Sequence, residues 1–453
     1  MDSPSQARPI SSNYRWVICG LLFFSTTVNY MDRQVISYLK EFFCTPAAQG
    51  GFGWSNTDFA YLTSFFTGIY ASMTILAGWV IDKIGTKLGL ALSLIIWSIF
   101  GILNAFVGRL VMMHVMVRSA FAVGEAGNFP ASIKTVAEWF PKRERALATG
   151  IFNSGSNCGA MIAAILVPWC LIHFGDEQGW KMAFILTGAV GFLWLISWFW
   201  LYDTPAKHKR LSQAEYDHIH IDDEIASDAQ TGDKAKVSWL RLFGYRQTWS
   251  FFFGKFLTDG IWWFLLFWLP DYLHKQFGMT KHDVMLPTFI VYGVAIFGSI
   301  YGGNIPMTFM KKGMQVYKAR VTAMLIIAVF PLTLLTTQYF GNVGHFGKMA
   351  AMLAVATICI GAAAHQAWSA NLFTTVSDMF PKKAVGSVTG IGTFAGGIGG
   401  VLVQLLAGKL TDAFKQNPQT AYLIMFIVCA LNYLIAWGIM KALVPRHTLI
   451  TDL

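Results

Sequence analysis

The stretch EWFPK at residues 138–142, followed by Gly150, recurs as DMFPK at residues 378–382, followed by Gly390. The match continues into the next segment, where GIFNSGSNCGA (150–160) corresponds to GIGTFAGGIGG (390–400). Both runs consist mainly of small residues, which let helices pack closely. The chain therefore contains two similar halves.

Around these stretches the sequence is a succession of long apolar segments. Of its 453 residues, 55% are hydrophobic and 13% are charged, whereas a soluble domain has about 25% charged residues. A membrane span needs about 20 mostly apolar residues. Segments of that length are expected at 15–43, 57–80, 88–106, 108–138, 144–173 and 181–201, and again at 247–276, 283–306, 320–340, 346–379, 383–413 and 419–443.

These segments predict an all-α membrane protein of 12 transmembrane helices in two parallel six-helix repeats. We expect two six-helix domains at residues 1–202 and 246–453, joined by a cytoplasmic linker at 203–245. Transporters built from parallel repeats bind their solute between the repeats near the membrane midplane. The pattern therefore favours transport over catalysis.

The formal net charge is +10, and the basic residues gather in alternate connections between the apolar segments. Lys and Arg are enriched in cytoplasmic loops, so this pattern predicts that both termini lie in the cytoplasm. It also explains the basic charge without a nucleic-acid partner. The six cysteines form no CxxC pair, and we expect neither a disulfide framework nor a metal site.

Four charged residues interrupt the apolar segments: Asp32 and Arg33 in the first, Arg118 and Glu125 in the fourth. Each such charge near the centre of a span costs roughly 2.5 to 3.5 kcal/mol. Arg118 and Glu125 are seven residues apart, so they share one helix face about 10 Å apart. They predict a solute or ion site, and the alternative is a structural ion-pair network that binds nothing.

The second half carries its own polar residues. Lys255 and Asp259 are four residues apart, which suits either a local ion pair or a ligand contact. His365 occupies the position that corresponds to Glu125 in the repeat, within the string AHQAW (364–368) that includes Gln366 and Trp368. It is either a pocket residue or a buried histidine with a local partner. Further aromatic residues that could stack on a sugar are Tyr30, Tyr70, Trp262 and Trp263.

The stretch GWVIDKIGTK (78–87) resembles the cytoplasmic loop signature of the major facilitator superfamily. That resemblance implies a gating role for Gly78, Asp82, Lys83, Gly85 and Lys87. The equivalent loop of the second half, GGNIPMTFMKKG (302–313), has a proline where the acid would be. We therefore expect one strong latch on the cytoplasmic side.

Longer stretches resemble the anion:cation symporter branch of that superfamily, the bacterial hexuronate, aldonate and glucarate transporters related to sialin. They are NYMDR (29–33), RSAFAVGEAGNFPASIK (118–134), EWFPKRERALATG (138–150) and AHQAWSANLFTTVSDMF (364–380). The resemblance implies proton-coupled uptake of a sugar acid, most of all a hexuronate such as galacturonate or glucuronate. It also implies that Arg33 holds the substrate carboxylate, that Arg118 belongs to the same network, and that Asp32 and Glu125 carry protons. The implied pocket comprises Tyr30, Tyr70, Lys255, His365, Gln366, Trp368 and Thr393.

Alternatives stay open at this point. Asp32, directly before Arg33, is a feature of aldonate and glucarate transporters, whereas Lys255 favours hexuronate. Organic-anion export, a receptor without flux and a membrane enzyme are further possibilities, although the sequence contains no catalytic constellation and no phosphate-binding P-loop. We expect a monomer in the bilayer of the bacterial inner membrane, with the proton as coupling ion and no other cofactor.

Overall fold

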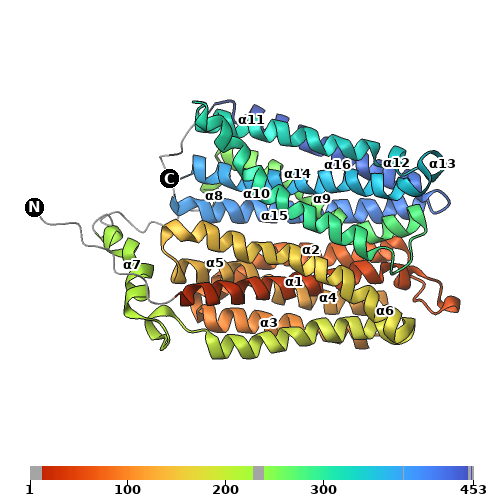
Figure 1. Ribbon diagram of the computed structural model, residues 1–453, viewed down its shortest axis with the longest axis horizontal. Helices are drawn as coiled ribbons and strands as arrows, with labels where there is room; N and C mark the ends of the chain where they lie inside the picture. Colours follow the sequence, from red (N-terminus) through yellow and green to blue (C-terminus); the bar gives the residue numbers. More distant parts are fainter. Residues whose placement is uncertain (1–12, 228–238, 381, 447–449, 451–453) are drawn as a thin grey trace, which may run out of the picture.

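The computed structural model describes residues 13–227, 239–380, 382–446 and 450. Within these ranges the secondary structure is entirely helical, which confirms the predicted class. Figure 1 shows the helices in two groups, α1 to α6 in the lower part of the view and α9 to α16 in the upper part. α1 begins and α16 ends toward one end of the molecule, and we call the opposite end, where α1 ends and α2 begins, the distal end.

The first group contains the helices of residues 14–201. They are α1 (Tyr14–Cys44), η1 (Ala47–Gln49), α2 (Asn56–Ile84), α3 (Thr86–Leu103), η2 (Asn104–Phe106), α4 (Val111–Glu125), α5 (Asn128–Trp139) and α6 (Lys142–Leu201). The connection to the second group contains η3 (Pro205–Lys207), α7 (Gln213–Ser227) and α8 (Trp239–Leu242).

The second group contains the remaining helices. They are α9 (Arg246–Phe277), α10 (Met285–Lys311), α11 (Val316–Val329), η4 (Phe330–Thr336), α12 (Thr337–Phe340), α13 (Val343–Phe346), η5 (Gly347–Met349), α14 (Ala350–Met379), α15 (Lys382–Ala413) and α16 (Pro418–Leu443). In the described part of the chain, nine helical stretches are long and apolar enough to cross a membrane. The count of 12 spans and the division into two domains stay predictions.

One predicted span is interrupted by a short turn in the structure. The segment 108–138 is two helices, α4 and α5, interrupted at Ala126 and Gly127. A Cβ at Gly127 would lie 2.0 Å from Ser93 Oγ, so the break packs directly on α3. The segments 144–173 and 181–201 both lie in α6, where two helices meet at a kink at Gly175, whose backbone is not helical at φ 70°, in agreement with two separate predicted segments. A left-handed glycine marks the turn because other residues rarely adopt that φ.

The small-residue run of residues 390–400 forms a close contact between the two groups. A Cβ at Gly397 would lie 2.2 Å from Ala71 Cβ, and one at Gly400 would lie 2.9 Å from Thr67 Cγ2. Both partners belong to α2, so α2 and α15 pack with almost no side chain between them. This close approach brings residues of both groups around the charges on α1.

The connecting helix α7 docks on the first group. Glu215, which is fully buried, accepts hydrogen bonds from the backbone N–H of Tyr14 at 3.0 Å and of Arg15 at 3.1 Å. Its carboxylate also pairs with the Arg15 guanidinium at 3.0 Å. Glu144, at the start of α6, receives the Arg15 Nε at 2.9 Å and contacts His218 at 3.0 Å. The carboxylate of Glu215, on α7, therefore caps the first turn of α1.

Candidate functional site

The centre of the site is an ion pair between α1 and α4. Arg33 Nε donates to Glu125 Oε2 at 3.0 Å, and a second guanidinium nitrogen lies 3.4 Å from Asn29 Oδ1. Both charged side chains are almost completely buried, with 1% and 0% of their surface exposed. Glu125 is the last residue of α4, directly before the break at Gly127, so the interrupted helix presents its carboxylate to α1. The structure thus brings together the predicted carboxylate-binding arginine and one predicted proton carrier.

Aromatic rings surround the Arg33 guanidinium. Its carbon lies 4.4 Å from the ring centre of Tyr30 and 4.5 Å from that of Tyr70. Phe66 and Trp263 are somewhat farther away, at 5.4 and 5.3 Å. Cation–π contacts within about 6 Å stabilise a desolvated guanidinium. Since Trp263 belongs to α9, the cation lies at the boundary of the two groups.

The hydrogen-bond partners of Arg118 are backbone carbonyls, whereas its positive charge had suggested a carboxylate. Its guanidinium donates to the backbone carbonyl of Arg33 at 3.0 Å and to that of Asp32 at 3.5 Å. It also lies over the ring of Phe121 at 4.3 Å. Arg118 therefore joins the predicted network by holding the backbone of α1 in place, while Arg33 alone has a carboxylate partner in this cluster.

Asp32 is buried with 2% of its surface exposed. Within the described part of the chain, neither of its carboxylate oxygens has a hydrogen-bond partner, and the same is true of Glu125 Oε1. Burying an ionised carboxylate without a partner is costly. These oxygens are therefore the atoms of the site at which a bound proton would relieve an electrostatic cost.

Three polar residues predicted in the second group, Lys255, Asp259 and His365, have partners within that group. Lys255 Nζ and Asp259 Oδ2 form a pair at 2.6 Å within α9. His365 stacks on Trp262 with ring centres 5.3 Å apart, and its Nδ1 lies 2.8 Å from the Tyr433 hydroxyl. The sequence indicated the pair and the buried histidine. It did not indicate Tyr433, because a tyrosine on the last span carries no pattern of its own.

Three other predicted pocket residues lie on α14 and α15. Trp368 is fully buried, and its ring is nearly perpendicular to that of Tyr433 with ring centres 5.6 Å apart. Thr393 donates a hydrogen bond to the carbonyl of Thr389 in its own helix at 3.0 Å, and Gln366 is half-buried. Their role in a pocket stays a prediction.

The predicted gating loop is the turn between α2 and α3. Gly85 adopts φ 84°, and a Cβ at Gly78 would lie 3.9 Å from Pro130. Lys83 Nζ lies 3.7 Å from the ring centre of Trp79, on its own helix, and Lys87 Nζ pairs with Asp203 at 3.1 Å. The Lys87 pair ties the start of α3 to the end of α6. The side chain of Asp82 lies outside the described residues.

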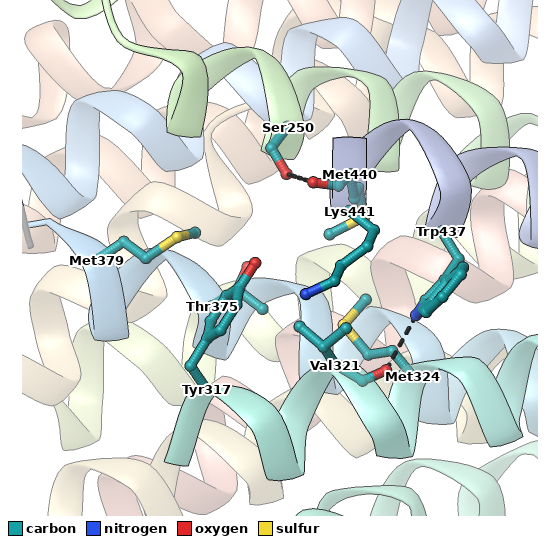
Figure 2. Close-up of a pocket in the computed structure, with 9 residues that line it drawn as sticks. All are labelled: Ser250, Tyr317, Val321, Met324, Thr375, Met379, Trp437, Met440 and Lys441. Atoms are coloured by element: carbon teal, nitrogen blue, oxygen red, sulfur yellow. Dashed lines mark hydrogen bonds between the residues drawn. The ribbon is translucent and has the colours of Figure 1, made fainter. Parts of the chain in front are cut away.

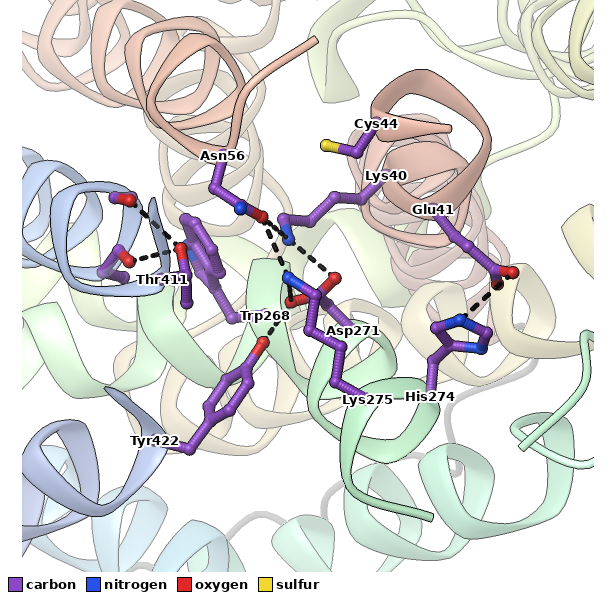
Figure 3. Close-up of polar contacts among 12 residues, drawn as sticks. Lys40, Glu41, Cys44, Asn56, Trp268, Asp271, His274, Lys275, Thr411 and Tyr422 are labelled. Atoms are coloured by element: carbon purple, nitrogen blue, oxygen red, sulfur yellow. Dashed lines mark hydrogen bonds and ion pairs between the residues drawn. The ribbon is translucent and has the colours of Figure 1, made fainter. Parts of the chain in front are cut away.

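A second polar cluster, at the distal end, was not predicted (Figure 3). Lys40 of α1 pairs with Asp271 of α9 at 2.7 Å, and Lys275 pairs with the other oxygen of the same carboxylate at 3.1 Å. Asn56 Oδ1, on α2, accepts from Lys40 at 2.8 Å and from Lys275 at 3.0 Å. The Tyr422 hydroxyl donates to Asp271 as well. The sequence signal was weak, because lysines near the ends of spans usually reach toward the lipid headgroups.

Further contacts close the same end of the molecule. Asp412 on α15 accepts the backbone N–H groups of Asn56 at 3.0 Å and Thr57 at 2.6 Å, which caps the start of α2. Glu41 lies 3.3 Å from His274. Together with the lysine cluster, these contacts join the first group to the second at the distal end.

One cavity lies away from both clusters (Figure 2). It is bordered by α9, α11, α14 and α16 and includes Ser250, Tyr317, Trp437 and Lys441 in its lining. Its volume of about 20 Å³ is enough for roughly one water molecule. It is too small for a sugar.

Two groups of membrane-length helices that meet around buried, oppositely charged side chains define a multi-pass membrane protein with the architecture of a solute transporter. Residues 22–404 match the family described as the Major Facilitator Superfamily. The chain belongs to this family, and it is therefore a membrane transporter and not an enzyme.

Similar proteins agree with this assignment. The chain is 29% identical over 431 residues to the hexuronate transporter of Escherichia coli (strain K12), covering 94% of each chain. It is 27% identical over 450 residues to the D-galactonate transporter of Escherichia coli O6:H1, covering 97% of this chain and 99% of that protein. Among solved structures, a bacterial homologue of the human lysosomal transporter Spinster superposes with a TM-score of 0.71 at 19% identity, covering 97% and 98% of the two chains.

Proposed function

We propose that this protein takes up a hexuronate, such as galacturonate or glucuronate, together with protons, by alternating access. The observation that carries the proposal is the environment of Arg33. This buried cation lies at the boundary of the two helix groups and has one internal carboxylate partner, which uses a single oxygen. The similarity to a hexuronate transporter over most of the chain supports the substrate class.

Exchange of carboxylates on Arg33 links the proton to the substrate. Protonation of Glu125 weakens its ion pair and frees the guanidinium. The substrate carboxylate then takes its place, and the planar fork of arginine can bind both of its oxygens in parallel. Proton and substrate binding therefore favour each other. Asp32, whose buried carboxylate oxygens accept no hydrogen bond from the described residues, is the second proton carrier in the proposal.

The rings and polar groups around Arg33 recognise the remainder of the sugar. Tyr30, Tyr70 and Trp263 offer aromatic faces for the apolar side of the ring. The Lys255–Asp259 pair of the second group supplies a cation and a carboxylate that can exchange their mutual contact for sugar hydroxyls. Closure of the two groups around the substrate then brings both sets of residues onto it.

The orientation follows from the basic connections in the sequence. We propose that both termini face the cytoplasm of a bacterial cell, that the protein lies as a monomer in the inner membrane, and that the distal end faces the periplasm. The polar contacts at the distal end then keep the periplasmic entrance closed in this conformation.

A ligand screen followed by a transport assay tests the proposal. The purified protein is heated with galacturonate, glucuronate, galactonate, glucarate or neutral hexoses, and we expect the hexuronates to raise the melting temperature most. Reconstituted in liposomes, the protein should accumulate labelled galacturonate when an inward proton gradient is imposed. Stabilisation by galactonate alone would favour the aldonate alternative that Asp32 indicates. Stabilisation by neutral hexoses alone would refute the sugar-acid class.

A further inference from the structure

The surroundings of Lys40 repeat those of Arg33. Both cations are on α1, seven residues apart, and therefore share one face of the helix about 10 Å from each other. Lys40 Nζ lies 5.5 Å from the ring centre of Phe59 on α2 and 4.4 Å from that of Trp268 on α9. Arg33 lies between a phenylalanine of α2 and a tryptophan of α9 in the same way. The chain thus presents two similar cation sites in series.

The two sites differ in where their carboxylate comes from. Glu125, the partner of Arg33, belongs to the same helix group as the arginine. Asp271, the partner of Lys40, belongs to the opposite group. When the groups separate at the distal end, Asp271 keeps Lys275, which is four residues away on the same helix, and also keeps Tyr422. Among the partners that the structure gives it, Lys40 keeps the neutral Asn56 and the ring of Phe59, and neither carries a negative charge.

Opening therefore leaves a buried lysine without its counter-charge at the mouth of the pathway. The neighbouring acids do not replace Asp271. Glu41 lies about 100° around the helix and contacts His274, and Asp412 caps the start of α2 from the opposite group. Lys40 is fully buried in the closed state, and nothing else in the cluster of Figure 3 offers it a second carboxylate.

We propose that Lys40 is an outer binding site for the substrate carboxylate, which replaces Asp271 when the distal end opens and is then passed two helical turns inward to Arg33. The inference rests on the proposed uptake of a sugar acid. It adds that the residue which locks the closed entrance is also the first to bind the anion. No covalent step is involved, since the lysine exchanges one carboxylate for another.

Three variants separate anion capture from simple locking. Whole-cell uptake of labelled galacturonate gives KM from the outside, and calorimetry in detergent gives the equilibrium Kd of the purified protein. Lys40→Met should raise KM about tenfold, as expected for one lost charged contact, and leave Kd unchanged. Asp271→Asn frees Lys40 and should lower KM or leave it unchanged. Lys275→Met, the matched control, breaks contacts to the same carboxylate and to Asn56 across the entrance but leaves Lys40 in place, and it should not raise KM.

The outcomes are distinct. If Lys40 only locks the entrance, then Lys40→Met and Asp271→Asn break the same contact and change KM in the same direction, which would overturn the inference. An unchanged KM for Lys40→Met would overturn it as well. Retained Kd in Lys40→Met shows that the variant is folded. If the wild-type protein neither binds nor takes up any sugar acid, the proposed function itself is refuted, whatever the variants show.

The native Cys44 reports the opening directly. It lies one turn beyond Lys40 on α1, half-buried, with its Sγ 3.9 Å from the Ser55 carbonyl. A membrane-impermeant maleimide added outside cells should label it faster in Asp271→Asn than in the wild type, with Cys44→Ser as the blank. Equal labelling rates would show that the Lys40–Asp271 pair does not hold the entrance closed, and would contradict the exchange of partners.

Discussion

Replacing Arg33 by lysine retains the positive charge and removes the planar fork. In the proposed complex the guanidinium binds two carboxylate oxygens, whereas an ammonium group concentrates its charge at one point. A hydrogen bond to a charged group contributes about 1.5 to 3 kcal/mol. With about 1.4 kcal/mol for each factor of ten, Arg33→Lys should bind galacturonate roughly 10- to 100-fold more weakly.

Isothermal titration calorimetry on the purified protein measures this change. Arg118→Lys is the matched control, because the guanidinium of Arg118 donates to the backbone carbonyls of Asp32 and Arg33 and to no carboxylate of the cluster. It should lower the melting temperature and weaken binding less than Arg33→Lys does. A wild-type Kd for Arg33→Lys would refute the assignment of Arg33 as the carboxylate ligand. A larger loss in the control would transfer that role to Arg118.

Three other changes probe coupling, packing and charge. Glu125→Gln should abolish galacturonate accumulation driven by a pH gradient in liposomes but retain exchange of labelled for unlabelled substrate. Accumulation at the wild-type level would rule out an essential proton on Glu125. Gly399→Ala places a Cβ 1.9 Å from the carbonyl oxygen of Phe256, so it should reduce the free energy of unfolding by about 1 to 3 kcal/mol and lower the melting temperature. In Gly438→Ala the new Cβ has no atom within 4 Å, and the melting temperature should stay unchanged. Burial alone would raise the pKa of Asp203, but hydrogen bonds from the next backbone N–H and from its lysine partner lower it below the usual range. The stability lost in Asp203→Asn should therefore be constant from pH 8 to pH 5 and shrink only below about pH 4. A stability difference between variant and wild type that already shrinks above pH 5 would contradict the lowered pKa.

Patterns of residue type predicted the helical class and the pair at the centre of the site. Long apolar segments indicate membrane helices because the backbone N–H and C=O groups must hydrogen-bond to one another where no water is present. Charges inside those segments are costly enough to indicate a purpose. On that basis Arg33 and Glu125 could be singled out, and the structure places them 3.0 Å apart.

Other features depend on three-dimensional partners that residue types do not reveal. Arg118 pairs with backbone carbonyls, which every residue has, so its charge indicated a carboxylate that it does not contact. The partner of His365 is Tyr433, on a helix without polar periodicity. Lys40 lies near the end of its span, where a lysine usually has no buried partner, and only the approach of α9 supplies Asp271.

The capping of α1 by Glu215 has a consequence for biosynthesis. The acid that accepts the first backbone amides of α1 lies 201 residues after Tyr14, so it leaves the ribosome only after all the helices of the first group have been made. A fragment that ends at residue 202 therefore lacks the group that completes its first turn, whereas one that continues through Ser227 contains it. The folding of the first helix group therefore depends on a segment that is translated after that group.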